Sequence, residues 1–293
     1  QYESSSFECT DCPNNCEIHK IKFSEEHKAK SIEHAKNKTL HYGSRCGKYD
    51  DTEDKQSAQH LKAKSPNYFK ERQKVLLQST SQSVGQSTCQ HTDRQDDRQT
   101  GRPTIGIPRI SVFYDLYPLW HTFFSELGLE IVLSDDTNRS IIKKGVENVV
   151  AEPCFPVKTA HGHIINVLEK GIDYLFIPFQ VNMPPLSKHF DRSYNCPYIQ
   201  ALPDTTRSAI DYKKYDTKII RPVFHMDRGR KEIEKTLKQI GKSIKHKTNN
   251  IDRCMARAFE AQERFDRWQT ERGQEVLSGN APALVLVTRS YNS

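Results

Sequence analysis

Four cysteines near the amino terminus have a spacing that is typical of metal and cluster sites. Cys9, Cys12 and Cys16 follow one another at gaps of two and three residues, and Cys46 comes after a further 29 residues. A two-residue gap lets two thiolates reach one metal ion without straining the backbone, and four thiolates complete a tetrahedral site or a cubane. Because all-cysteine ligation suits both iron–sulfur clusters and zinc, the spacing leaves both open.

Cys154 and Cys196 form a second candidate pair of ligands. Cys154 lies in the EPCFPVK segment at 152–158, where two prolines restrict the backbone, and Cys196 lies in the NCPY segment at 195–198. We expect each cysteine to follow a strand, so that both lie at the carboxyl edge of a parallel sheet, where ligands bind. The alternative is that both are small buried side chains.

Three side chains near Cys154 are candidates for a supporting role, namely Lys158, His161 and His163. A positive charge at Lys158 would balance an anionic cluster or favour a nearby thiolate, although a surface lysine fits equally well. The two histidines are two residues apart at an expected helix start, so they face different directions. Either histidine could contact the Cys154 site, or both could have a capping or surface role. Cys89 and Cys254 are expected to have no functional role.

The composition is that of a polar, basic chain. Its 293 residues carry 44 basic and 37 acidic side chains, a net charge of +7, and a mean hydropathy of −0.77. No secretory signal follows Gln1, and no apolar run is long enough to cross a bilayer. The basic residues are interleaved with acidic ones and lack an aromatic–basic motif, which favours a solvated surface over nucleic-acid binding. We therefore expect a cytoplasmic fragment of a longer product, with reduced cysteines.

Four segments of the chain differ in composition. Residues 1–50 hold half of the cysteines and short alternating runs that favour small strands. Residues 51–103 are rich in polar side chains and predict a disordered linker with one amphipathic helix at 67–77. Residues 104–250 predict an α/β domain. Residues 251–293 predict a helix and the first strand of a truncated second α/β unit.

The α/β prediction rests on alternating strand and helix patterns. Apolar side chains recur with the helical period from Leu116 to Leu127, and Gly128 is expected to end that helix. Short strand–helix–strand connections imply right-handed parallel crossovers. The predicted fold is therefore a flavodoxin-like parallel sheet covered by helices. Strands are expected near residue 105 and at 129–133, 172–178 and 217–224, and further helices at 138–147 and 157–170.

Several motifs of catalysis do not occur in this sequence. It has no glycine-rich phosphate loop of the Walker or dinucleotide type, no serine nucleophile elbow and no zinc-protease motif. On its own, the chain is therefore not expected to be an ATPase, a dehydrogenase or a hydrolase.

The central block of the chain resembles the acyl-CoA dehydratase activase-related family, which is itself similar to the 2-hydroxyacyl-CoA dehydratase subunits. The four-cysteine segment also resembles the segment that precedes this domain in the long activase proteins. The resemblance covers residues 1–50 and 105–292. It is carried by IGIPR at 105–109, FYD at 113–115, FFSELG at 123–128, EPCFPVK at 152–158, HGH at 161–163 and DYLFIP at 173–178.

The resemblance implies an anaerobic iron–sulfur protein that handles low-potential electrons around a CoA-thioester dehydratase. In the dehydratase relatives, cysteines on such loops hold a cluster between two α/β domains, which implies Cys154 and Cys196 as ligands of a 4Fe–4S cluster. Two motifs depart from the family pattern, TRSYN at 288–292 for its GRPYN and GSRC at 43–46 for its GGRC. The comparison therefore predicts a fragment without the second α/β domain and without the ATP-binding module of the activases.

Three functions fit these observations. The main hypothesis is an iron–sulfur accessory or electron-transfer component, with CoA-thioester dehydratase or activase subunits as partners. The alternative is a zinc-stabilised scaffold or interaction protein that uses the four amino-terminal cysteines structurally and has no redox chemistry. The third is a dehydratase-like subunit. Each of these three functions is compatible with a homo-oligomer.

Overall fold

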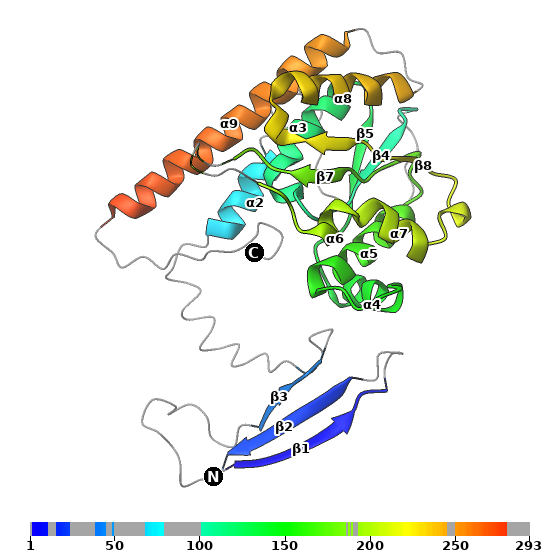
Figure 1. Ribbon diagram of the computed structural model, residues 1–293, viewed down its shortest axis with the longest axis vertical. Coiled ribbons are helices and arrows are strands. Elements are labelled where there is room, and N and C mark those ends of the chain that lie inside the picture. Colours follow the sequence, from blue (N-terminus) through cyan, green and yellow to red (C-terminus); the bar gives the residue numbers. More distant parts are fainter. Residues whose placement is uncertain are drawn as a thin grey trace.

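A computed structural model describes most of the α/β region and parts of the amino-terminal segment (Figure 1). The described residues are 2–10, 16–23, 39–44, 49, 68–78, 101–185, 187, 189, 193–244 and 250–279. Most of the predicted linker and the strand predicted near residue 285 lie outside them. Among the described helices, none combines the length and the apolar character that crossing a bilayer requires.

A four-stranded parallel sheet is the centre of the α/β region. Its strands are β4 (Thr104–Ile107), β5 (Glu130–Leu133), β6 (Tyr174–Phe176) and β8 (Lys218–Ile220), and each neighbouring pair is parallel. The order across the sheet is β5-β4-β6-β8. In chain order this is 2-1-3-4, which matches the first four strands of the flavodoxin-like arrangement. The predicted α/β class with a parallel sheet is confirmed.

Two of the expected strands are interrupted by proline. The run predicted as one strand at 217–224 is split by Pro222 into β8 and β9 (Val223–His225), and Pro178 similarly separates β6 from β7 (Phe179–Asn182). Proline cannot donate to a ladder, so each strand bends there. The pairing continues past the bend, because the Phe179 amide donates to the Pro222 carbonyl oxygen at 2.8 Å and β7 then pairs with β9.

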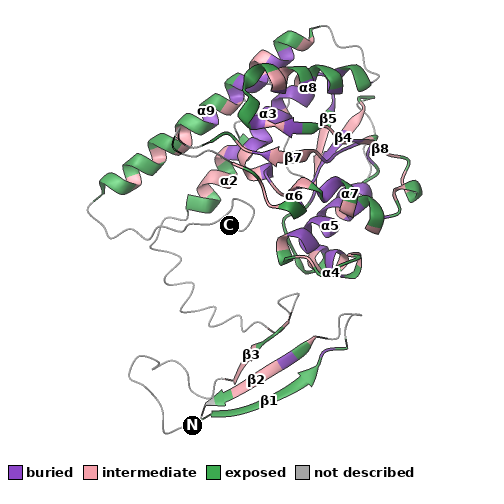
Figure 2. Ribbon diagram, in the orientation of Figure 1, coloured by how far each residue is buried: buried purple, intermediate pink, exposed green. Residues whose placement is uncertain are grey.

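One face of the sheet is covered by α3 (Phe113–Glu126) and α8 (Arg230–Ser243). Helices α2 (Tyr68–Gln78) and α9 (Ile251–Ser278) pack against α3, and Figure 2 shows buried residues in α3, in α8 and in the first half of α9. The helical stripe predicted from Leu116 to Leu127 is confirmed. It ends at Gly128, whose φ of 85° suits a residue without a side chain.

The other face carries α4 (Arg139–Glu147), α5 (Phe155–Leu168), α6 (Pro197–Gln200) and α7 (Leu202–Ala209). A second apolar cluster joins α5 to Leu175 and Ile177, while Phe176, one residue away, belongs to the cluster on the opposite face. This alternation is what a strand buried on both sides requires. Two short 3₁₀ helices complete the described elements, at Tyr212–Lys214 and Met226–Arg228.

Two helices that the sequence pattern assigned outside the α/β domain pack against its core. Leu76 of α2 is fully buried in the cluster that contains α3. Helix α9 lies along α3, with an ion pair of 2.8 Å between Arg257 and Glu126. Arg272 of α9 also pairs with Glu71 of α2 at 2.9 Å. Both helices therefore contribute to the same core as the parallel sheet.

The amino-terminal part forms a separate antiparallel sheet of β1 (Tyr2–Glu8), β2 (Glu17–Phe23) and β3 (Thr39–Tyr42), in the order β1-β2-β3. The seven residues of β1 are all exposed, and Ile18 of β2 is fully buried. With so little apolar burial, this sheet needs a further source of stability.

Helices α4 and α5 cross in backbone contact through a pair of glycines. A Cβ atom on Gly162 would fall far inside van der Waals contact with the carbonyl oxygen of Ile141, and one on Gly145 would collide with the carbonyl oxygen of Lys158. Small residues at a helix crossing let the two backbones approach closely. The α4–α5 hairpin therefore depends on the absence of side chains at these two positions.

We expect Gly162→Ala to lower the free energy of unfolding by about 2–3 kcal/mol, because the added methyl group must push the two helices apart. The measurement is urea denaturation followed by circular dichroism. Gly273→Ala in α9 is the matched control, since nothing lies within 4 Å of a Cβ there. The control should gain roughly 0.5–1 kcal/mol from helix propensity. Equal effects of the two substitutions would contradict the close crossing.

Candidate functional site

One end of the small antiparallel sheet gathers chain segments that carry the amino-terminal cysteines. Cys9 directly follows β1 and Cys16 directly precedes β2. The Cys9 amide donates to the Cys16 carbonyl oxygen at 2.8 Å, which closes the hairpin at this end. Cys9 is buried, Cys16 is half-buried, and neither is in a disulfide. Cys12, which the sequence places between them, lies outside the described residues.

The segment on either side of Cys46 is anchored at the same end of this sheet. Gly43 follows β3 with a φ of 105°, and its backbone lies so close to the Glu17 carbonyl oxygen that a side chain would collide with it. Beyond Cys46, the ring of Tyr49 contacts that of Phe7 with 5.2 Å between centroids. Cys46 itself lies outside the described residues. Gly43 and Tyr49 lie beside the ends of β1 and β2.

Cys154 is the residue that precedes the first turn of α5 (Figure 1). The prediction that a strand precedes it is wrong, because residues 148–154 only connect α4 to α5 and contain no strand. Further along α5, His163 contacts Ser134 at the carboxyl end of β5. Since Cys154 is nine residues earlier, it lies roughly 14 Å from His163 along the axis of α5. Its side chain is exposed.

Cys196 precedes α6 at the end of a loop that is tied to β7. The Asn195 amide donates to the Val181 carbonyl oxygen at 2.9 Å, and the Asn195 side chain donates to the Gln180 carbonyl oxygen at 3.0 Å. The Gln200 side chain in turn donates to the Asn195 carbonyl oxygen at 2.6 Å. These bonds fix the backbone on the amino-terminal side of Cys196, whose side chain is half-buried.

The structure brings the two cysteine-bearing helix starts to one apolar cluster. The cluster consists of Val157 and Ala160 from α5, Ile199 from α6 and Leu202 from α7, with Cys196 packed against it. Val157 lies in the first turn of α5, directly after Cys154. The helix that Cys154 precedes and the loop that carries Cys196 therefore meet at this cluster, although 41 residues separate the two cysteines in the sequence.

Exposed aromatic side chains neighbour both cysteines in the sequence. Phe155 follows Cys154, and Tyr194 and Tyr198 lie two residues before and after Cys196; their exposed fractions are 46%, 62% and 46%. Single exposed apolar side chains of this kind are normal on a protein surface.

Lys158 is buried rather than on the surface. Its ammonium group forms an ion pair with the carboxylate of Glu152, and the lysine side chain is only 6% exposed. Glu152 and Lys158 are the two ends of the segment that contains Cys154. The positive charge is therefore balanced within this segment, and it braces the turn that leads into α5.

His161 and His163 lie in the middle of α5, so the prediction that they lie at its start is wrong. Both are 2% exposed. The Nδ1 atom of His161 is 2.8 Å from the Val157 carbonyl oxygen. His163 lies between two hydroxyl groups, with its Nδ1 atom 2.8 Å from Ser134 and its Nε2 atom 3.0 Å from Thr137. These contacts make His163 a buried link between α5 and the loop after β5.

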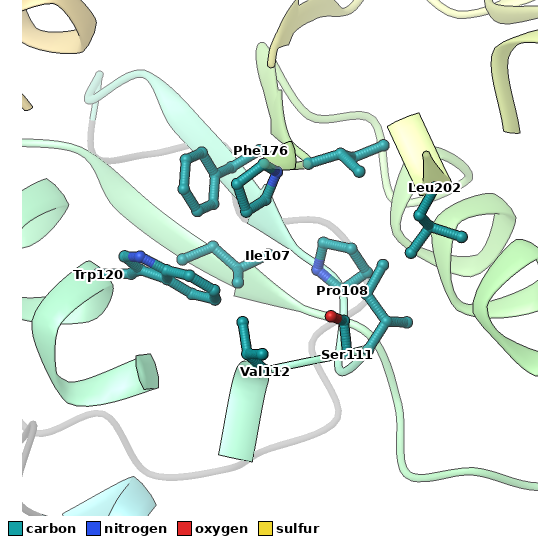
Figure 3. A pocket seen from close by; sticks show the side chains of 10 residues that line it. Ile107, Pro108, Ser111, Val112, Trp120, Phe176 and Leu202 are labelled. Atoms are coloured by element: carbon teal, nitrogen blue, oxygen red, sulfur yellow. The ribbon is translucent and has the colours of Figure 1, made fainter. Parts of the chain in front are cut away.

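A pocket lies at the carboxyl ends of β4 and β6, beside the apolar cluster of Cys196 (Figure 3). Its volume is about 20 Å³, and Leu202 belongs both to its wall and to that cluster. Ser111 and Trp120 line it, and no sequence motif marks either residue. The strand order would have predicted the position of this pocket. In open α/β sheets, ligands bind where one crossover connection passes over one face of the sheet and the next passes over the other face.

No group of three or more potential metal ligands from histidine, cysteine, aspartate and glutamate occurs within the described ranges. Cys154 and Cys196 are two thiols, fewer than the four ligands of an all-cysteine site. Cys254 is buried in α9 and belongs to the main core.

Two histidines should make the protein sensitive to mild acid. Burial lowers the pKa of His121 to about 4, and burial together with the charge of Arg109 lowers the pKa of His163 to about 4, against an ordinary value of 6.5. Between these values the unfolded chain binds more protons than the folded one. The free energy of unfolding should therefore fall as the pH drops from about 6.5 to about 4, by up to about 1.4 kcal/mol per pH unit for each histidine.

Urea titrations at several pH values measure this slope. His163→Gln should reduce it, whereas His189→Gln, at an exposed histidine, should leave it unchanged. An unaltered slope in the His163 variant would show that this residue does not titrate as its burial requires.

Comparisons with known proteins place the α/β region in one family. A family model described as the CoA enzyme activase uncharacterised domain matches residues 104–293. This match includes the parallel sheet and both Cys154 and Cys196, and the four-cysteine segment precedes it. Searches of curated proteins and of solved structures found no match. Because the matched region is more than half of the chain, the protein belongs to the family defined by the CoA enzyme activase uncharacterised domain.

Proposed function

We propose that this chain is an iron–sulfur accessory or electron-transfer component of a cytoplasmic system related to the 2-hydroxyacyl-CoA dehydratase activases. Its partners would be CoA-thioester dehydratase or activase subunits. Family membership supports the activase setting. The observation that carries the redox part of the proposal is that Cys196 packs against a cluster containing Val157 and Ala160 of α5, the helix that Cys154 precedes.

The surroundings of Cys154 suit a negatively charged ligand. The residue precedes the fourteen-residue helix α5, and the positive end of a helix dipole stabilises an anionic group there. Neither Cys154 nor Cys196 is in a disulfide, and the exposed thiol of Cys154 is open to a bound cluster. A 4Fe–4S cluster held here would supply a one-electron redox centre.

Two thiols leave such a cluster incomplete, and the exposed aromatics indicate where the other ligands would come from. Phe155, Tyr194 and Tyr198 are exposed and lie next to the cysteines in the sequence, so a partner that docked there would bury apolar area. A second protein surface docked beside the cysteines would contribute the missing ligands and exclude water from the cluster. Cys154 and Cys196 therefore fit a cluster site that is shared between this chain and a partner protein.

The amino-terminal cysteines support a second metal centre in the same chain. The ends of β1, β2 and β3 bring Cys9, Cys16 and the anchors of Cys46 to one end of a sheet that buries little apolar surface. A bound metal would supply the stability that this sheet otherwise lacks. An iron–sulfur cluster is our proposal for this centre, with zinc as the alternative. If zinc binds here, the zinc-stabilised scaffold is the better description of the protein, and the dehydratase-like subunit is the further alternative.

Anaerobic purification followed by metal analysis tests the amino-terminal centre. We expect brown protein with broad absorption near ~400 nm, as thiolate-ligated iron gives. Replacing Cys9, Cys12, Cys16 and Cys46 together by serine should remove the iron of this centre, and Cys89→Ser should remove none. Colourless protein with stoichiometric zinc would refute the redox interpretation and support the scaffold.

Cys154→Ser tests the second centre in protein produced anaerobically from the full coding sequence and mixed with its dehydratase or activase partner. We expect the loss of roughly four iron atoms per complex and of the corresponding paramagnetic resonance signal. Thermal stability should hold, because the side chain is exposed and serine is a favourable residue before a helix.

Cys254→Ser is the matched control, since this thiol is buried among apolar side chains. The Cys254 thiol donates to the Asn250 carbonyl oxygen at 3.2 Å, and a serine hydroxyl can do the same, so the substitution should lower the free energy of unfolding by less than about 1 kcal/mol and leave the iron content unchanged. If Cys154→Ser behaves like the control, Cys154 is a packing residue and not a ligand.

A further inference from the structure

Strand β1 of the small antiparallel sheet has an open outer edge. It lies at the end of the strand order β1-β2-β3 and pairs with β2 (Figure 1). All seven of its residues are exposed, and no strand of the described part of the chain pairs with its other side. A free edge of this kind is a template on which another strand can pair.

The backbone groups of β1 alternate between β2 and this open edge. The Cys9 amide donates to the Cys16 carbonyl oxygen at 2.8 Å, and these two residues continue the register in which Phe7 lies opposite Ile18. In an antiparallel ladder, hydrogen-bonded pairs recur at every second residue. The odd-numbered residues of β1 therefore bond to β2. The amides and carbonyl oxygens that point outward belong to the even-numbered residues, Tyr2, Ser4, Ser6 and Glu8.

The sequence of β1 lacks the features that usually prevent a strand edge from pairing. Proteins protect such edges with prolines, lysines or bulges. The β1 sequence, YESSSFE, contains neither proline nor lysine, and its register with β2 runs through seven consecutive pairs without a shift. The outward-facing edge is therefore regular along its whole length and suited to pairing.

The side chains of β1 are compatible with an antiparallel copy of the same strand. A two-fold axis at Ser5 pairs each glutamate with an aromatic residue and the flanking serines with each other. The opposed pairs are Tyr2 with Glu8, Glu3 with Phe7 and Ser4 with Ser6. Like charges directly opposite one another would be destabilising, and this register avoids them. It also aligns every outward-pointing residue of both strands, which allows about eight interstrand hydrogen bonds.

A second copy would supply stability that the small sheet lacks. Within this sheet and the adjoining cysteines, the described apolar side chains that are buried are Cys9 and Ile18, whereas Tyr2 and Phe7 are 66% and 40% exposed. Joining two copies would make β1 an inner strand of one continuous sheet and would give both aromatic rings new neighbours. Because both copies use the same edge, the contact closes at two copies.

We propose that this chain forms a two-fold symmetric dimer by antiparallel pairing of β1 with β1 of a second copy. Cys9 lies four residues from the axis, so the Cys9 residues of the two copies are roughly 27 Å apart along the strand direction. The contact therefore leaves both cysteine ends of the joined sheet accessible. It depends on the backbone edge and not on the metal, so it stands independently of the proposed redox function.

Amide hydrogen exchange measured by NMR on the 293-residue chain tests which backbone groups form the contact. The Ser5 and Phe7 amides donate to β2 and should exchange slowly at every protein concentration. The Ser4 and Ser6 amides should exchange rapidly in dilute protein and become protected as the concentration rises and the dimer forms. Exchange at Ser4 and Ser6 that does not depend on concentration would overturn the proposal.

Paired charge variants test the same contact by sedimentation velocity. Ser4→Lys with Ser6→Lys places lysines opposite lysines across the axis, and Ser4→Glu with Ser6→Glu places glutamates opposite glutamates. Each pair should weaken dimerisation roughly tenfold, without disturbing the fold because both serines are exposed. An equimolar mixture of the two variants should regain the dimer, since each lysine then lies opposite a glutamate.

Ser208→Lys, at an exposed serine of α7, is the control and should dimerise like the parent chain. Three results would each overturn the proposal. They are a parent chain that stays monomeric at ~0.5 mM, unweakened dimerisation of both charge variants, and a mixture of the variants that does not associate.

Discussion

Close contact of α5 with its neighbours is the constraint on which the arrangement of this protein depends. Gly145 and Gly162 bring α4 against α5 backbone to backbone, and Gly106 of β4 leaves room for Val167 and Ile172 at the other end of the helix. These contacts fix the helix along its length. Cys154, Lys158 and His163 take their positions from that placement, and so does the wall shared by the pocket and Cys196.

Sequence periodicity was sufficient for the elements that repeat a simple pattern. The apolar stripe of α3, its glycine end and the parallel crossovers all follow from local rules, and together they predict the α/β class. The candidate site was harder to predict from the sequence. Cys154 was expected after a strand, and the two histidines at a helix start, because no local pattern shows that α4 folds back on α5 through two glycines. Likewise, hydropathy alone predicts one continuous strand at each of the two positions where Pro178 and Pro222 divide the strand in two.

Long-range packing explains the remaining differences. The amphipathic helices α2 and α9 were recognisable as helices, but the face that each covers depends on α3, which is far away in the sequence for both. The convergence of Cys154 and Cys196 on one cluster is equally non-local. Ser111 carries no motif at all, and its positive φ and its place in the pocket wall are visible only in the structure.

The paired prolines have a consequence for how this protein avoids misassembly. Pro178 and Pro222 lie at corresponding points of neighbouring strands, so the β6–β8 ladder changes direction where it passes into β7 and β9. A flat, straight strand edge is a template on which other chains can polymerise as cross-β structure. The Pro222 carbonyl oxygen accepts from the Phe179 amide, so its hydrogen-free nitrogen also faces this inner side, and the change of direction is what interrupts the outer edge. A strand that added alongside β8 could not continue straight along β9, so the described edge does not offer one long template.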